Sequence, residues 1–148
     1  MKKFLLIAIC FSFAFPVFAQ TAAEIENLLN TDAVNYGQAA RLVLLASGNP
    51  DLSPQAAFRF ASEHGWLPSR AEANDQARLN GLSLLVMKAF DISGGFFYSS
   101  LGTAHYAYRE LVYRNIFQGR IAPVMPVSGE LLIFTVNRVL AFQESNQL

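Results

Sequence analysis

Hydrophobic residues recur at helical spacing in several separate segments of this chain. The first strongly periodic segment after the N-terminal region carries on one face Ala39, Leu42, Val43 and Ala46. The segment 78–90 is apolar on nearly every side, as expected for a helix that is covered on two faces. Positions three and four apart share a face of an α-helix. The pattern therefore predicts an all-α fold of five or six helices with little or no strand.

Capping and breaking residues divide the chain into these helices. Short polar side chains accept hydrogen bonds from the free amides of a first helical turn. Six helix starts are marked in this way by Thr21, Asn35, Ser53, Asn74 or Asp75, Thr103 and Ser128. Gly48 and Gly65 are placed to end helices, and Gly119 is placed to end the turn after the fourth core helix. The aromatic segment 96–101 lies next to glycines and is predicted to be a loop or a short strand, and the polar tail from Gln143 is predicted to fray.

An internal repeat with an offset of 50 residues links two pairs of helices. Arg59 is echoed by Arg109 and Val86 by Val136, with similar residues around each. One offset shared by two separate helices indicates a duplicated helix pair. We expect the backbones of the two pairs to superpose. Their inward faces predict a core that includes Leu85, Val86, Leu132 and Val136.

The N-terminus has the three parts of an export signal. Lys2 and Lys3 precede the apolar stretch 4–15, and Ala19 ends a small-residue cleavage pattern. This apolar stretch is shorter than the roughly 20 residues that a helix needs to cross a bilayer. We therefore expect residues 1–19 to be removed as a signal peptide during export to the periplasm or cell envelope. An N-terminal anchor that is retained is the alternative.

Cleavage after Ala19 defines the expected mature chain, a single domain over residues 20–142 followed by the tail 143–148. Cys10 is the only cysteine and leaves with the signal, so the mature domain has no disulfide. Loss of the two N-terminal lysines leaves nine basic and eleven acidic residues, which argues against a nucleic-acid partner. No second long apolar run follows, so no transmembrane span is expected in the mature chain.

The sequence contains no recognisable catalytic or metal-binding constellation. His64 and His105 are the only histidines, and they are not spaced as metal ligands. No serine lies in the nucleophile motif of hydrolases, and the carboxylates form no close pair for acid–base chemistry. We therefore expect no cofactor, no metal and no enzymatic activity. A small exported enzyme is the alternative from another functional class.

Aromatic residues gather in the second half of the chain. The set comprises Phe96, Phe97, Tyr98, Tyr106, Tyr108 and Tyr113. It is flanked by Arg109, Arg114 and Arg120. In one interpretation the rings belong to the core and the arginines to a solvated helix face. In the other, the region is a platform for an anionic glycan or an acidic protein partner, because aromatic faces anchor interfaces and arginine binds carboxylates.

Short motifs in this half match those of a known repeat family. Residues 105–107 (His-Tyr-Ala) stand where the family has His-Trp-Ala, and residues 116–119 (Ile-Phe-Gln-Gly) stand at its glycine-ended turn. Pro123 leads to the last helix, whose residues 138–140 (Arg-Val-Leu) match an Arg-Ala-Leu-like helix end. The chain thus resembles the S-layer homology domain. The resemblance implies repeated helix-pair units, about two and a half of them over residues 20–142.

The chain departs from this family at its wall-binding signature. In the family, a Thr-Arg-Ala-Glu-like tetrapeptide opens the first helix of each unit, and its arginine contacts cell-wall polysaccharide. The corresponding positions 35–38, 78–81 and 128–131 lack an arginine at the second place. Residues 69–72 (Ser-Arg-Ala-Glu) read like the tetrapeptide but lie too early for the following helix. The resemblance therefore implies the fold more strongly than the ligand.

The resemblance also implies where a binding surface would lie. Ligand contacts in the family gather where the first helix of one unit begins beside the second helix of its neighbour. In this chain that neighbourhood draws on Tyr36, Gln38, Arg78, Asn80 and Arg120. The next candidates, if exposed, are Phe97 and Tyr98. We expect an exported, non-catalytic binding or scaffolding module for an envelope protein assembly, with a module that binds cell-wall glycan or peptidoglycan as the alternative.

Overall fold

The computed structural model describes residues 15–119 and 121–145, and the fold of this part is all-α, as predicted. In chain order the helices are α2 (Phe15–Leu29), α3 (Tyr36–Ala46), α4 (Pro54–Glu63), α5 (Leu79–Ala89), α6 (Phe96–Leu101), α7 (Ala104–Tyr113) and α8 (Gly129–Ser145). These seven helices are one more than the largest number expected, and the described residues contain only isolated bridges in place of strands. The N-terminal lysines and nearly all of the apolar stretch of the expected signal lie outside the described residues.

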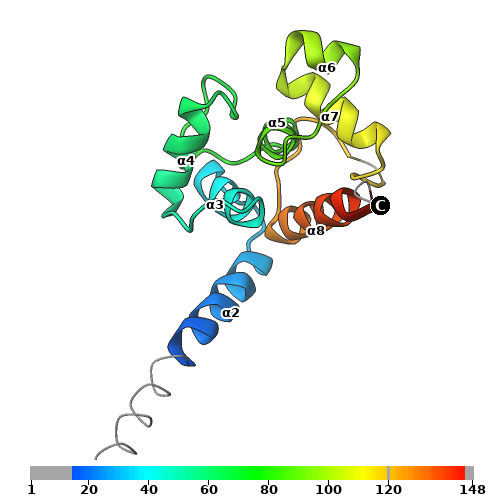
Figure 1. The fold of residues 1–148 in the computed structure, drawn as a ribbon. Helices are drawn as coiled ribbons and strands as arrows, with labels where there is room; N and C mark the ends of the chain where they lie inside the picture. Colours follow the sequence, from blue (N-terminus) through cyan, green and yellow to red (C-terminus); the bar gives the residue numbers. More distant parts are fainter. Residues whose placement is uncertain (1–14, 120, 146–148) are drawn as a thin grey trace, which may run out of the picture.

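Three helices surround the centre of the fold, and two more lie outside them. Figure 1 shows α3, α5 and α8 around a common centre, with α4 and α7 farther out. Among these helices, α4 packs mainly on α3 and α7 on α5. The predicted core is confirmed, because Leu85, Val86 and Leu132 are fully buried and Val136 is nearly so.

A closed ring of three backbone hydrogen bonds ties the central helices together. The Val34 N–H donates to the Val127 carbonyl at 2.8 Å, the Val127 N–H to the Ala77 carbonyl at 3.0 Å, and the Ala77 N–H to the Val34 carbonyl at 2.9 Å. All three residues are fully buried, and each lies two positions before the first residue of a central helix. The ring therefore fixes the starting points of α3, α5 and α8 relative to one another.

The first turn of each central helix is completed by a neighbouring link. The leading amides of a helix have no partner within the helix and must find one elsewhere. Here they donate to carbonyls of the segment that enters another central helix, in the pairs Tyr36 to Asp75, Leu79 to Met125 and Gly129 to Thr31. The three junctions thus follow one pattern, and the arrangement approximates threefold symmetry.

The helix boundaries recur at the offset read from the sequence. α4 spans 54–63 and α7 spans 104–113, while α5 begins at Leu79 and α8 at Gly129. Asn115 ends α7 in the left-handed conformation, with a φ of 57°, at the position that corresponds to Gly65. Asparagine takes the left-handed conformation more readily than most residues, which explains why it can stand at this position in place of glycine. Gly119, which we expected to end the turn after this helix, also has a positive φ of 85°.

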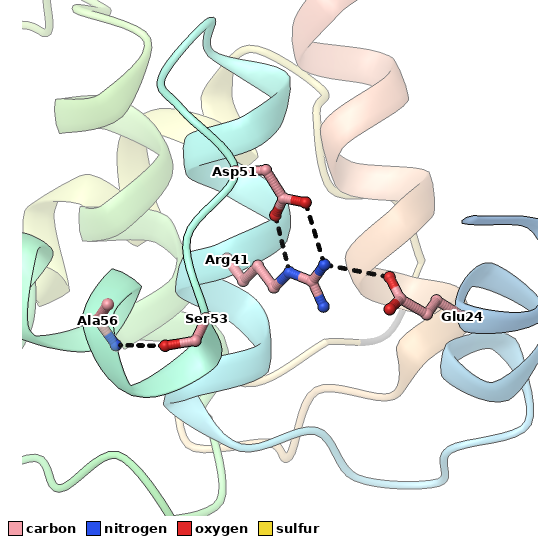
Figure 2. Close-up of polar contacts among 5 residues, drawn as sticks. All are labelled: Glu24, Arg41, Asp51, Ser53 and Ala56. Atoms are coloured by element: carbon pink, nitrogen blue, oxygen red, sulfur yellow. Dashed lines mark hydrogen bonds and ion pairs between the residues drawn. The ribbon is translucent and has the colours of Figure 1, made fainter. Parts of the chain in front are cut away.

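Three predicted N-caps are confirmed, those of Asn35, Ser53 and Ser128, and Ser128 accepts a hydrogen bond from the Leu131 N–H at 3.1 Å. The cap expected at Asn74 or Asp75 was wrong, because α5 begins after Arg78 and has no side-chain cap. Asn35 accepts a hydrogen bond from the Gln38 N–H, while the Gln38 side chain accepts one from the Asn35 N–H, which is a full capping box. Ser53 accepts from the Ala56 N–H, as Figure 2 shows. Thr103 occupies the cap position of α7 but makes no capping hydrogen bond with its side chain.

The N-terminal helix α2 differs from its prediction. It begins at Phe15 rather than after a cap at Thr21, since no breaking residue follows Pro16 and proline is tolerated in a first helical turn. It therefore runs through the expected cleavage point after Ala19. No helix in the described part of the chain is both long and apolar enough to span a membrane.

Arg41 of α3 connects α2 to the segment that follows α3. Its Nε and Nη2 bind the two carboxylate oxygens of Asp51 at 3.0 and 3.2 Å, and Nη2 also lies 3.2 Å from Glu24 of α2 (Figure 2). The forked hydrogen bonding from Arg41 lowers the pKa of Asp51. These side chains are substantially exposed, so their ion pairs contribute little to the stability of the fold. Their main effect is to orient α2 relative to α3.

The C-terminal helix is longer than predicted. We expected fraying from Gln143, but α8 continues to Ser145, and the Gln143 side chain donates to the Phe90 carbonyl at 2.8 Å. This hydrogen bond to the end of α5 satisfies a carbonyl that the helix itself leaves free. The polar sequence led us to expect fraying from Gln143, whereas residues 143–145 are helical.

The ring of hydrogen bonds makes the stability of the fold depend on the backbone N–H of Ala77. Replacing Ala77 with proline removes its N–H and leaves the buried Val34 carbonyl without its donor, which should lower the free energy of unfolding by about 1–3 kcal/mol or more. Ala77→Gly keeps the donor and should cost roughly 0.5–1 kcal/mol. Urea denaturation monitored by circular dichroism compares the two variants. Equal losses for both would show that the ring contributes nothing specific.

Candidate functional site

The connection between α5 and α7 is twice as long as its counterpart in the first helix pair. Residues 47–53 join α3 to α4, whereas residues 90–103 join α5 to α7. The longer connection contains the short helix α6, which lies at the outer edge of the molecule beside α7 (Figure 1). The shorter connection joins its two helices without an additional helix, and we call α6 the insertion because the first pair has no counterpart of it.

The segment 96–101 is a helix and not the loop or strand that we expected. Gly95 takes the N-cap position, and Gly102 ends the helix in the left-handed conformation with a φ of 57°. The Gly95 N–H donates to a carboxylate oxygen of Glu110 on α7 at 3.0 Å. A carboxylate from another helix thus stabilises a start that has no capping side chain of its own.

Glu110 and Arg114 hold this insertion in place. The second oxygen of Glu110 accepts from Arg114 Nε at 2.9 Å, and Arg114 Nη2 donates to the Ser93 carbonyl at 2.5 Å. Arg114 also lies over the ring of Phe142 on α8, 5.1 Å from its centroid. Burial raises the pKa of Glu110, but the hydrogen bonds from Gly95 and Arg114 outweigh it, and the pKa is lowered. The ionised pair therefore anchors the connection 90–103 to α7 and α8.

The insertion arranges a series of aromatic rings across α6 and α7. Phe96 meets Phe97 edge-on, with 5.7 Å between ring centroids. Phe97 is nearly parallel to Tyr106, at 5.6 Å and 11°. His105 meets Tyr106 edge-on at 5.3 Å. Such offset and edge-on arrangements are favourable, and they hold each ring in a defined orientation.

Much of this aromatic surface faces solvent. The exposed fractions are 79% for Phe96, 61% for Phe97 and 83% for Tyr113. We call Phe96, Phe97, Tyr106 and Tyr113 the aromatic platform. With Gly95, Tyr98, Arg109 and Glu110 these residues line a shallow hollow of about 200 Å³. Contiguous exposed apolar surface is uncommon on soluble proteins and marks interaction sites.

The structure does not expose Tyr36, which we expected to belong to the binding surface. This residue is only 5% exposed, because its ring packs against Gly81, where any side chain would overlap it. The Tyr36 hydroxyl accepts a hydrogen bond from the Arg78 N–H at 3.4 Å. Burial raises the pKa of Tyr36, and Arg78 partly offsets the effect. Tyr36 therefore belongs to the packed junction between α3 and α5.

The other predicted polar residues largely serve the same junction. Gln38 completes the capping box of α3, and the Asn80 side chain accepts from the Gly81 N–H at 2.8 Å. Arg78 is exposed, but its Nη1 donates to the Val124 carbonyl at 3.2 Å. Arg120 lies outside the described residues. The structure thus brings Tyr36 and Arg78 together and uses several of their polar groups within the fold.

The two aromatic candidates have different positions. Phe97 belongs to the aromatic platform, whereas Tyr98 is 8% exposed and packs against Gly94, with Lys88 Nζ 5.7 Å from its ring centroid. Burial raises the pKa of Tyr98, and the nearby charge of Asp91 adds to the shift. The corrected candidate site consists of the aromatic platform with Arg109. The length of the connection between the helices was the sequence signal that could have favoured it.

Glu110 gives the site a measurable dependence on pH. Its pKa lies below the ordinary 4.5, so its stabilising contribution is complete above that value and is lost as the pH falls through the lower, folded-state pKa. Glu110→Gln should unfold at a lower temperature than the wild type at pH 7 and lose less stability on acidification below pH 4.5. Thermal melts over this pH series test the expectation, with Glu63→Gln on α4 as the control. Identical acid profiles for Glu110→Gln and the wild type would contradict it.

The platform presents exposed aromatic rings beside an exposed arginine, Arg109. Among the described residues, no three His, Cys, Asp or Glu side chains are grouped so that they could hold a metal ion. No protein-family model matches the chain, and neither does any curated protein or solved structure at a significant level.

Proposed function

We propose that this protein is an exported, non-catalytic binding module that docks an envelope protein through the aromatic platform. The observation that carries the proposal is that the connection 90–103 contains an extra helix whose two phenylalanines are exposed. Burial of apolar surface drives folding, so exposed phenylalanines at 79% and 61% contribute little to the fold itself. Aromatic residues and arginine are also the residue types enriched at protein interfaces.

A protein partner is favoured over a cell-wall glycan by the polarity of the surface. A glycan site needs polar groups around its stacking rings to bind the sugar hydroxyls. In the platform, both carboxylate oxygens of Glu110 are already occupied by Gly95 and Arg114. At the junction of α3 and α5, the side chains of Gln38 and Asn80 bind within the fold. The surface that remains is mainly aromatic, which suits an apolar partner.

We further propose that the helix pairs are organised as in an S-layer homology domain. The support is the arrangement of α3, α5 and α8 around one centre, with α4 and α7 outside them (Figure 1). The segments 35–38, 78–81 and 128–131 have no arginine at their second place, which argues against the wall-polysaccharide binding of that family. We therefore propose that the helices are arranged as in this family, whereas the binding surface lies on the insertion that carries α6.

The proposed export can be tested separately, because it predicts the N-terminus of the mature protein. We expect the secreted or periplasmic protein to begin at Gln20, because basic, apolar and small-residue segments follow one another before it. Intact-mass analysis of the protein recovered from the envelope fraction of its native host measures the N-terminus directly. A protein that retains Met1 would show that residues 1–19 act as an anchor or play another part.

Site-directed photocrosslinking tests the binding surface. Benzoylphenylalanine in place of His105, an exposed neighbour of Tyr106, should crosslink to a protein in native envelopes. The matched control replaces Gln55, which is exposed at the corresponding position of α4. Adding Phe96→Ser and Phe97→Ser should abolish the crosslink at position 105 while costing roughly 1–2 kcal/mol of stability, because the rings are largely exposed.

The crosslinked material decides between the candidate partners. A defined protein adduct at position 105, absent at position 55, supports the proposal. Adducts with glycan strands alone would favour the wall-binding alternative. Equal crosslinking at both positions, or crosslinks that survive the two serine substitutions, would show that the platform is not the binding surface.

A further inference from the structure

The size of the hollow in the aromatic platform restricts what can enter it. Its volume of about 200 Å³ lies below the roughly 300–1,000 Å³ typical of pockets that enclose a small molecule. The aromatic walls favour an apolar occupant. A hollow of this size and lining suits one bulky apolar side chain presented by a larger partner.

The charge at the hollow restricts the partner further. Arg109 lines the hollow and is exposed, and within the described ranges it forms no ion pair. The neighbouring Glu110 is not available to it, because its oxygens bind the Gly95 N–H and Arg114. The local field is therefore positive, and the planar guanidinium of Arg109 offers forked donors that match a carboxylate.

Building on the proposed function, we propose that the platform recognises a partner segment with a bulky apolar residue directly beside an Asp or Glu. The apolar side chain occupies the hollow, and the carboxylate pairs with Arg109. Complementary charge gives such a contact its orientation and selectivity, while the buried ring or aliphatic chain supplies most of the affinity. A membrane surface fits less well, because binding to anionic lipid relies on clusters of basic residues.

The repeat supplies a matched control for the charge. Arg59 is exposed on α4 at the position that corresponds to Arg109 on α7. No inserted helix adjoins it, since the connection 47–53 is short. Arg59→Glu therefore makes the same change of charge on the same protein without altering the platform.

Fluorescence anisotropy with synthetic peptides tests the proposal. The probes are labelled 12-residue peptides with a central Phe flanked by Glu, by Gln or by Lys. We expect the wild type to bind the Glu-flanked peptide at least about tenfold more tightly than the Lys-flanked one, as one favourable charge contact allows. Arg109→Glu should reverse the order, Arg109→Lys should weaken the preference, and Arg59→Glu should leave it unchanged. Circular dichroism confirms that each variant is folded.

Each other outcome overturns the inference in a distinct way. Binding that depends on Phe97 but not on peptide charge removes the role of Arg109 and leaves the proposed function standing. No binding of any peptide, alongside a protein crosslink at position 105, rules out a short linear segment but not a protein partner. Sedimentation with phosphatidylglycerol vesicles, lost in Phe97→Ser, would assign the platform to a lipid surface and overturn both proposals.

Discussion

The fold depends on one closed set of backbone hydrogen bonds among Val34, Ala77 and Val127. Each bond by itself contributes only about 0.5–1.5 kcal/mol, but a buried amide or carbonyl left without its partner costs about 1–3 kcal/mol. Because every residue of the ring both donates and accepts, moving one central helix breaks two bonds at once. The positions of α3, α5 and α8 are therefore coupled, and the outer helices inherit their placement from them.

The outer helices α4 and α7 carry different side chains at positions that correspond to each other at the offset of 50 residues. On α4, Phe60 stacks on His64 with ring centroids 4.2 Å apart, and both rings meet Trp66. The corresponding positions on α7 carry Glu110 and Arg114, whose ion pair holds the inserted connection. The same two positions thus form a local aromatic cluster at α4, whereas at α7 they hold the connection 90–103 with its helix α6. The candidate site arises from this difference between the units.

Local signals allowed much of the helical framework to be predicted, because caps and periodic apolar faces act over a few residues. The capping box of Asn35 and Gln38 is one such case. The errors arise where distant residues decide. Six residues over 96–101 are too few for a periodic pattern to indicate a helix, and its start depends on Glu110. The burial of Tyr36 depends on the missing side chain at Gly81, which its own neighbours in sequence do not reveal.

The ring also imposes an order on folding. Val34 follows the first described helix and Val127 precedes the last, so the final bond joins residues far apart in the chain. Contacts of high sequence separation form slowly, because the loop between them must first be closed. The central core therefore cannot be completed until Val127 has been synthesised and is free to pair. Until then the Val34 N–H and the Ala77 carbonyl lack their partners, and the three central helices cannot lock together.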